Sequence, residues 1–414
     1  MKLRIKILLT AFLILFPLVL SGCWDYEEYE DLIQVEGLGI DYDKESREIR
    51  LTFEYTPTTT GQTGKTDSSG SSAQKTQIVH SATDETLLDI LPKLQQVIYK
   101  KIFFGYLKVI VISEEAAKYN MANIIIWLDR TPVLRSTVLM VVTPGTAEET
   151  LSTLDAGNLE TSSKEIFNII NLSQLTGAAY PVSVHDLAQM MTIPGIEATV
   201  PRVITVSKKN KPDAKGGIEG NIKYDIEREG DHRVAGLAAF KGDKFAGWMD
   251  EKECLGFGWI TGKKITTYKA SETSADTENA LYFRVLKSKG GIKVQIDNDK
   301  PSFQVNVKVN VDIRKYYSNQ GSDDFLSIKE ISDMEKKLSD SIRSDIEAAL
   351  KRGQKELKSD IFGFGFALFR KDPKLWRTEF EEKWEDIYPD LPIKINVEAK
   401  IINTGTSNRK FKFR

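Results

Sequence analysis

The chain has 414 residues, of which 57 are Lys or Arg and 59 are Asp or Glu. This near balance excludes the strongly basic footprint of a nucleic-acid-binding protein, so we expect no nucleic-acid partner. Apolar residues make up 41% of the chain and aromatic residues 9%, a composition typical of folded domains rather than of intrinsic disorder.

The first 22 residues have the pattern of a secretory signal. Residues 1–6 carry three basic side chains and no acid, and the 14 residues over 7–20 carry no charge. This uncharged run is shorter than the roughly 20 apolar residues that a membrane-spanning helix needs. We therefore predict a signal peptide over residues 1–22, with cleavage after Gly22.

The residues before Cys23 predict a lipid anchor at that cysteine. An apolar residue and two small ones, Leu-Ser-Gly, precede it and form a lipobox. In such a segment the thiol takes a diacylglycerol, and the amino group freed by cleavage takes an acyl chain. Stable anchoring requires more than one chain, which a lipoprotein provides. An ordinary secretory peptide that happens to precede a cysteine is one alternative interpretation. An uncleaved membrane anchor is the other, and the short apolar run disfavours it.

Residues 23–206 are predicted to form an α/β region, in one lobe or two. Alternating apolar residues on both sides of a polar turn predict a β-hairpin over 32–55. Apolar runs and helical periodicities then follow one another, as they do where helices cover a parallel sheet. The expected elements are a helix from 84 to about 98, a strand over 107–113, a helix over 115–128, a strand over 136–144 and a helix over 146–154. The Ser-, Thr- and Gly-rich stretch 57–77 predicts a flexible loop, either a tolerated insertion or a segment that orders on a partner.

The polar stretch 207–217 is the predicted domain boundary, and residues 218–414 are predicted to form an α+β domain. Its expected elements are hairpins over 232–249 and 281–296 (turning at Gly290-Gly291), a strand over 303–314, a helix from 328 to about 357 and a closing strand over 391–403. The strand over 303–314 alternates without a fault, which is typical of an antiparallel sheet with one buried face. The long helix carries an apolar stripe that can cover this sheet. The predicted fold class is therefore α+β (mixed α/β), multi-domain, with mixed sheets packed with helices.

No residues form a recognisable catalytic or metal-binding pattern. His80, His185 and His232 lie far apart, and none has a metal-ligating neighbour at helical spacing. The common hydrolase, metalloprotease and phosphate-loop motifs are absent. Cys254 lies two residues after Lys252 and could be a reactive thiol, although a small buried apolar residue is the favoured reading. We expect no enzyme activity, no metal and no cofactor.

Aromatic residues gather in two stretches, for which core packing is the favoured interpretation and a partner-binding surface the alternative. The two sets are Phe245, Trp248, Phe257 and Trp259, and then Phe362 to Phe369 with Trp376 and Trp384. Gly363 and Gly365 alternate with phenylalanines after a helix rather than a strand. That placement favours a tight turn or close helix packing over a nucleotide-binding loop.

The order and spacing of several stretches resembles the Ger(x)C family, the C-subunit lipoproteins of nutrient germination receptors in endospore-forming bacteria. These stretches are the lipobox followed by CWDYEEYEDLIQVEGLGIDYD, then GLAAFKGDKFAGWMDEKECLGFGWITGK, SDIFGFGFALFRKDPKLW, EFEEKW and IKINVEAKIINTG. The resemblance runs from Cys23 to about Gly405, and the long stretch 57–77 departs from the family pattern.

This resemblance implies a mixed α/β fold in three domains and carries over no catalytic residues. It implies lipidation of Cys23, a place on the outer face of the spore inner membrane, and assembly with two membrane-embedded partners, the A and B subunits. The expected function is that of a non-enzymatic subunit of a receptor that triggers germination in response to nutrients. Whether this subunit contacts the nutrient stays open, and a solute-binding lipoprotein is the alternative function.

Overall fold

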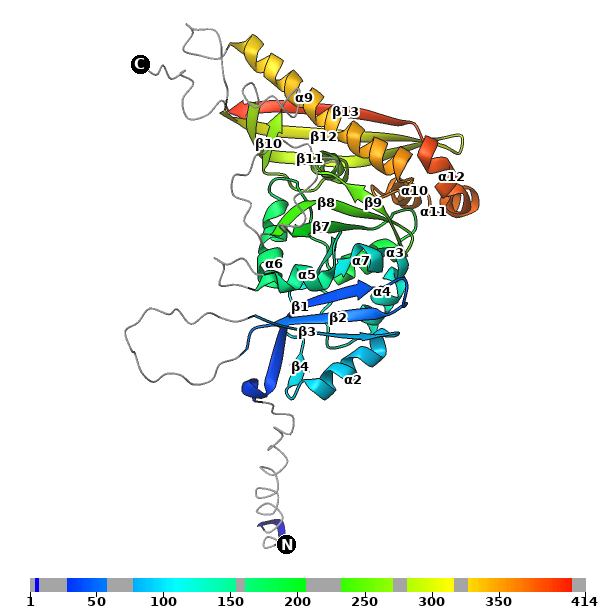
Figure 1. The fold of residues 1–414 in the computed structure, drawn as a ribbon. Helices are drawn as coiled ribbons and strands as arrows, with labels where there is room; N and C mark the ends of the chain where they lie inside the picture. The colour runs from blue at the N-terminus through cyan, green and yellow to red at the C-terminus, as the bar shows by residue number, and fades with distance from the viewer. Residues whose placement is uncertain are drawn as a thin grey trace, which may run out of the picture.

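A computed structural model describes residues 4–6, 28–57, 77–153, 161–205, 232–270, 281–315 and 327–403. Two β-sheets with helices packed against them make up this part of the chain (Figure 1). Within the described residues, nine strands form the first sheet: β1 (Leu32–Tyr42), β2 (Ile49–Tyr55), β3 (Ile78–Asp84), β4 (Lys101–Phe103), β5 (Val109–Ser113), β6 (Leu139–Thr143), β7 (Thr199–Thr205), β8 (His232–Lys241) and β9 (Lys244–Met249).

The first sheet has a parallel centre and antiparallel sides. Its order is β3-β2-β1-β5-β6-β7-β8-β9, and β4 pairs with the beginning of β1. β1, β5, β6 and β7 run parallel, whereas β2 and β3 on one side and β8 and β9 on the other are antiparallel to their neighbours. The predicted hairpin over 32–55 is confirmed, with Ile40 opposite Leu51.

Helices cover both faces of the first sheet because its central strands are apolar on both sides. Val109 and Val111 of β5 pack on one face, and Ile110 and Ile112 pack on the other. The helices of this region are α2 (Leu87–Val97), α3 (Glu114–Tyr119), α4 (Met121–Arg130), α5 (Ala147–Ser152), α6 (Ser162–Ser173) and α7 (Val184–Thr192). Helices α5 and α6 share the core of Val109, and α2, α3, α4 and α7 share that of Ile110. The predicted alternation of helices and strands is thereby confirmed.

The second sheet has the order β10-β11-β12-β13 and is covered by a long helix. Its elements are β10 (Thr267–Ala270), β11 (Leu281–Asp297), β12 (Lys300–Lys315), β13 (Ile393–Asn403) and the helices α8 (Glu251–Thr261) and α9 (Ile328–Leu350). The apolar residues at alternate positions of β12, from Phe303 to Ile313, are all buried, as its pattern predicts. Leu338, Ile342 and Ile346 of α9 are fully buried, which confirms the predicted stripe.

Short helical segments follow α9 and lead to the last strand. They are η3 (Lys351–Glu356), α10 (Phe364–Lys371), α11 (Pro373–Leu375), η4 (Trp376–Phe380), η5 (Glu381–Lys383), α12 (Trp384–Ile387) and η6 (Tyr388–Asp390). A continuous core extends from the α5 and α6 face of the first sheet to the second sheet, and α8 contributes to it between β8 and β11.

Two details of the predicted C-terminal sheet were wrong. β13 runs parallel to β12, with Val305 opposite Ile395, so this sheet is mixed rather than wholly antiparallel. Gly290 and Gly291 lie inside the single long strand β11, and the hairpin turns instead at Asn298 and Asp299, both of which have positive φ. Gly290 serves close packing there, because a Cβ on it would lie 1.9 Å from the carbonyl oxygen of Trp259 in α8.

The predicted domain boundary at 207–217 and most of the predicted loop at 57–77 lie outside the described residues. On either side of the boundary, β7 and β8 pair antiparallel, with Val200 opposite Ala238. The first sheet therefore takes strands from both predicted domains, and the division at 207–217 stays a prediction.

Candidate functional site

The predicted anchor, Cys23, and the predicted cleavage site after Gly22 lie outside the described residues, so lipidation stays a prediction. The described chain resumes at Glu28 and passes through η1 (Tyr29–Asp31) into β1, whose first residue lies nine positions after Cys23. Among the residues that the structure describes, none of the helices combines the length and apolar character needed to cross a bilayer.

Two carboxyl groups meet at the N-terminus of α6 and form what we call the carboxyl cluster, Glu36, Glu54, Lys108, Thr161 and Ser163. Glu36 of β1 pairs with Lys108, whose Nζ is 2.8 Å from Oε2, and accepts a hydrogen bond from the Thr161 hydroxyl at 3.2 Å. Glu54 of β2 is fully buried, and its Oε2 accepts the backbone N–H of Ser163 at 2.9 Å. The cluster thus joins β1, β2 and the start of β5 to the first turn of α6.

The two carboxyl groups of this cluster have opposite protonation preferences. Burial and, to a smaller extent, the charge of Glu36 raise the pKa of Glu54 to about 7, although the hydrogen bonds from Ser163 oppose the rise. Oε1 of Glu54 has no hydrogen-bond partner among the described residues. Burial also acts to raise the pKa of Glu36, but the hydrogen bond and charge of Lys108, with the hydroxyls of Thr56 and Thr161, outweigh it and the net pKa is lowered. The pair therefore holds one ionised carboxylate and one group that takes up a proton near neutral pH.

The chemistry available to the carboxyl cluster is proton binding rather than catalysis. A catalytic carboxyl pair needs room for a substrate between its members, whereas Glu54 is sealed in the core. In the described part of the chain, no group of three or more His, Cys, Asp or Glu side chains could hold a metal ion. The cluster is best understood as a cap that fixes α6 to the sheet.

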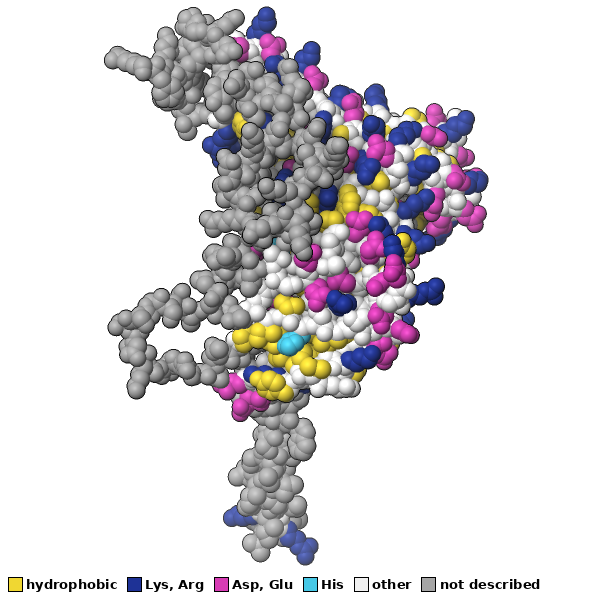
Figure 2. Space-filling view, in the orientation of Figure 1, with side chains coloured by type: hydrophobic (Ala, Val, Ile, Leu, Met, Phe, Trp, Pro, Cys, Tyr) yellow, Lys and Arg dark blue, Asp and Glu magenta, His cyan; other side chains and the backbone are white. Residues whose placement is uncertain are grey.

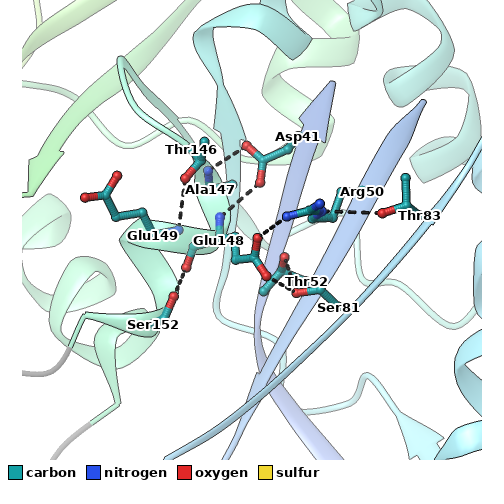
Figure 3. A network of polar contacts seen from close by, with 10 residues as sticks. All are labelled: Asp41, Arg50, Thr52, Ser81, Thr83, Thr146, Ala147, Glu148, Glu149 and Ser152. Atoms are coloured by element: carbon teal, nitrogen blue, oxygen red, sulfur yellow. Dashed lines mark hydrogen bonds and ion pairs between the residues drawn. The ribbon is translucent and has the colours of Figure 1, made fainter. Parts of the chain in front are cut away.

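A second polar network joins the neighbouring helix α5 to the same sheet (Figure 3). Asp41 accepts the backbone N–H groups of Ala147 and Glu148 at 2.7 and 3.0 Å, so a side chain from β1 caps the first turn of α5. The Glu148 carboxylate pairs with Arg50 and accepts the Ser81 hydroxyl at 2.7 Å. Residues of β1, β2 and β3 thus fix α5 across the sheet.

Trp248 of β9 is the polar junction between the two halves of the molecule. Its indole N–H donates to Glu114 of α3 at 3.0 Å, and the Arg202 guanidinium lies 4.6 Å from its ring centroid. Its carbonyl oxygen accepts the Nε–H of Arg352, which follows α9, at 2.9 Å. One tryptophan thus contacts both the first sheet's helices and the segment that leads to the last strand.

The structure does not bring the three histidines together. His80 stacks on Tyr55 with ring centroids 5.8 Å apart, and His185 is exposed on α7. His232 is buried on β8 beside the Thr205 hydroxyl, and burial lowers its pKa to about 4. Cys254 is fully buried on α8, and burial raises the pKa of its thiol well above the usual value. The interpretation of Cys254 as a small core residue is therefore confirmed.

The second aromatic set encloses a buried carboxylate that the sequence analysis did not single out. Asp360 accepts the backbone N–H groups of Gly363, Phe364 and Gly365 and the indole N–H of Trp384, all at 3.0 Å or less. Burial raises its pKa to about 7 although these four donors oppose the rise. A sequence signal for this cap exists, namely an Asp three residues before a Gly-x-Gly at a helix start.

Most aromatic residues of both sets lie in the core, as predicted. Those that are buried are Phe257, Trp259, Phe362, Phe364, Trp376 and Trp384, whereas Phe245, Trp248, Phe366 and Phe369 are half-buried. Gly363 has a φ of 79°, and a Cβ on Gly365 would lie 2.8 Å from Cα of Gly195. The predicted tight turn and close packing of these glycines are both confirmed.

The sequence pattern did not indicate a polar site at Glu36 and Glu54 either. Each is a single acidic residue in a strand, where an outward-facing glutamate would give the same pattern. The one available signal was the place of Glu54 between two aromatic residues, Phe53 and Tyr55, which suggests a strand buried on both faces. All three positions are buried in the structure.

Comparison with known proteins places both halves of the chain in spore germination families. Residues 25–205 match the family described as the spore germination protein N-terminal domain. Residues 235–405 match the family described as spore germination B3/GerAC like, C-terminal.

Several curated proteins resemble the chain over nearly its whole length. Spore germination protein KC of Bacillus subtilis is 24% identical and covers 98% of each chain. Spore germination protein B3 of Bacillus subtilis is 23% identical over 94% of this chain and 96% of its own. GerQC of Bacillus cereus is 21% identical over 96% of this chain and 98% of its own.

The crystal structure of the GerBC protein has the same fold. It superimposes with a TM-score of 0.53 at 18% sequence identity, and the match covers 89% of this chain and 97% of that one. The mixed α and β, multi-domain fold class predicted from the sequence is thereby confirmed. With both family matches and a shared fold over most of its length, the chain belongs to the Ger(x)C family of spore germination proteins.

Proposed function

We propose that this protein is a lipid-anchored subunit of a nutrient germinant receptor and acts by assembly with membrane-embedded receptor subunits. The observation that carries the proposal is the match of both halves of the chain, over 25–205 and 235–405, to spore germination families. Curated relatives named as spore germination proteins align with nearly the entire chain, so the likeness includes more than one shared module.

The proposed role is non-enzymatic and places the protein on the outer face of the spore inner membrane. The lipobox that ends at Cys23 supports the anchor, and the eight residues between Cys23 and β1 would serve as a short tether. The buried carboxyl groups described above cap helices, so we assign them a structural role in the folded protein. The partners would be the A and B subunits, which are embedded in the membrane.

The anchor can be tested by mass spectrometry of the N-terminal peptide and by membrane fractionation. We expect the mature chain to begin at Cys23 and to carry a diacylglycerol and an N-linked acyl chain. Cys23→Ala should abolish this labelling and weaken retention in the membrane fraction. Cys254→Ala is the matched control, because that buried thiol has no part in anchoring and should leave labelling unchanged. An unmodified Cys23 in the wild type would refute the anchor.

A further inference from the structure

The end of α2 and the segment that leads from it to β5 expose large apolar and aromatic side chains to solvent. Residues 97–108, VIYKKIFFGYLK, contain three lysines, four aromatic residues and no acid. Val97 is 78% exposed, Tyr99 91%, Tyr106 52% and Phe103 39%. We call these four side chains the basal face. Four large exposed side chains within ten positions exceed the scattered single cases that are normal on a protein surface.

The basal face is held outward by the core beneath it. Ile98, Phe104 and Leu107 alternate with the exposed residues and are buried in the core of the first sheet. The exposed side chains therefore cannot turn inward without pulling these anchors out. On the outer side, the rings of Phe103 and Tyr106 lie 6.2 Å apart, and Lys100 Nζ lies 5.7 Å from the ring centroid of Tyr99.

The basal face lies at the end of the molecule from which the predicted tether emerges. β4 carries Phe103 and pairs with the first residues of β1, with Leu32 opposite Lys101. Because a fully extended residue spans about 3.3 Å, nine residues place Leu32 within roughly 30 Å of an acylated Cys23. β4 and α2 lie at the opposite end of the molecule from the second sheet (Figure 1). Hydrophobic side chains gather at this lower end in the space-filling view (Figure 2).

We propose that the basal face lies against the headgroup region of the lipid bilayer and sets the orientation of the protein on the membrane. The inference rests on the lipid anchor proposed above. Tyrosine rings settle at the membrane interface because one end is apolar and the other polar, and lysine stems extend along apolar surface while their charge stays in water. In this pose the second sheet and α9 point away from the bilayer.

The acidic residues at the start of the described chain indicate which force holds this contact. Glu28, Glu30 and Asp31 are exposed near the beginning of β1 and repel an anionic surface. Lys100 and Lys101 offset this repulsion only in part, because Lys108, the third lysine of the segment, is paired with Glu36. The contact therefore depends on the aromatic rings, and it should persist at an ionic strength that screens charge pairs.

Fluorescence quenching on vesicles tests the proposed pose. The full-length lipoprotein is reconstituted into vesicles of phosphatidylglycerol and phosphatidylethanolamine, without other proteins, after Tyr99→Cys and labelling with an environment-sensitive dye. The label is selective, because Cys254 is fully buried and Cys23 is acylated in the proposed form. Ile328→Cys is the matched control, since Ile328 is an apolar residue that is 88% exposed at the start of α9.

With nitroxide-labelled headgroups in the vesicles, we expect emission from position 99 to fall by roughly half or more, because a residue at the interface lies within contact of the quencher. Emission from position 328 should stay unchanged. Co-flotation of the protein with the vesicles is measured in the same sample. Flotation without quenching at position 99 would overturn the basal-face proposal while leaving the anchor intact. Loss of flotation would refute the anchor and the pose together.

Discussion

Glu54 in the first sheet and Asp360 in the C-terminal region are both buried carboxyl groups at the start of a helix, yet their surroundings differ. Asp360 accepts four N–H groups, three from the backbone and one from Trp384. Glu54 accepts the backbone N–H of Ser163, and one of its oxygens has no partner among the described residues. Both oxygens of Asp360 therefore have donors, from its own loop and from Trp384, whereas Glu54 has one oxygen without a partner in the described part of the chain. Burial raises the pKa of both groups to about 7.

The packing around the two groups differs in the same way. The ring of Phe364, the first residue of α10, packs against two other aromatic rings. Its centroid lies 5.8 Å from that of Phe303 and 6.2 Å from that of Tyr388. Glu54 lies instead between two strands and the polar residues of α6. The C-terminal region therefore packs aromatic rings around its buried carboxyl group, whereas the first sheet surrounds Glu54 with strands and a polar helix start.

The aromatic centre of the C-terminal region should give the largest loss of stability on truncation. Phe364→Ala removes a fully buried ring and leaves a cavity, so we expect the free energy of unfolding to fall by about 4 kcal/mol. Phe366→Ala on the same helix removes a half-buried ring and should cost less than half as much. Chemical denaturation of both variants measures the difference, and equal losses would contradict the proposed centre.

The unsatisfied carboxyl group of the first sheet predicts a pH-dependent difference in stability. The folded protein holds the Glu54 proton more tightly than the unfolded chain, with a pKa of about 7 against 4.5. This contribution is fully present below about pH 4.5 and is lost as the pH rises through about 7. Glu54→Gln stays neutral. Relative to wild type, its free energy of unfolding should rise by up to about 3 kcal/mol from about pH 5 to about pH 8.

Glu36→Gln provides the opposite control within the same cluster. The pKa of Glu36 is lowered, because Lys108 and the hydroxyls of Thr56 and Thr161 together outweigh the effect of burial. Its ionised form therefore contributes stability that is lost as the pH falls. This variant should be less stable than wild type at neutral pH and approach it in acid. Urea unfolding at a series of pH values measures both variants. A pH-independent difference between Glu54→Gln and wild type would show that Glu54 keeps an ordinary pKa.

Two adjacent glycines of β11 differ in how closely other atoms approach them. A Cβ on Gly290 would lie 1.9 Å from the Trp259 carbonyl oxygen, whereas a Cβ on Gly291 would meet nothing within 4 Å. We expect Gly290→Ala to lower the free energy of unfolding by roughly 2 kcal/mol, because α8 and β11 must separate. Gly291→Ala should change it by less than about 0.5 kcal/mol. Similar thermal stability of the two variants would contradict this contact.

The surface ion pairs should have the smallest effect in both regions. Arg50 pairs with Glu148 at the first sheet, and Lys308 pairs with Glu398 across β12 and β13. Because such pairs are exposed, we expect Arg50→Ala and Lys308→Ala each to lower the free energy of unfolding by about 0.5 kcal/mol. A loss above about 2 kcal/mol for Arg50→Ala would mean that the network of Figure 3 is a stabilising core element.

The spacing of apolar residues predicted the helices and strands well, because the buried face of each element requires apolar side chains at its own period. The alternation in β12 and the stripe of α9 both appear in the structure at the predicted positions. Strand direction was less accessible, since a strand parallel to β12 and one antiparallel to it need the same alternation, and β13 was assigned wrongly for that reason. The Gly290-Gly291 pair failed similarly, because a close contact and a turn select the same residue.

The polar sites were largely inaccessible from sequence because their partners are distant along the chain. Glu54 and Ser163 are separated by more than a hundred residues, and only the fold brings them together. Asp360 is local, and its cap could have been recognised from the glycines that follow. Family resemblance carried the function instead, through the order of several stretches rather than through any one site.

A pull-down from detergent-solubilised spore membranes tests whether the protein assembles with membrane-embedded receptor subunits. Wild type and Cys23→Ala are compared side by side, with Cys254→Ala as the control for a cysteine change outside the anchor. Our account predicts that wild type and Cys254→Ala recover the same two multi-pass membrane proteins, and that Cys23→Ala recovers less of both. Recovery of no membrane protein by the wild type under mild conditions would contradict it.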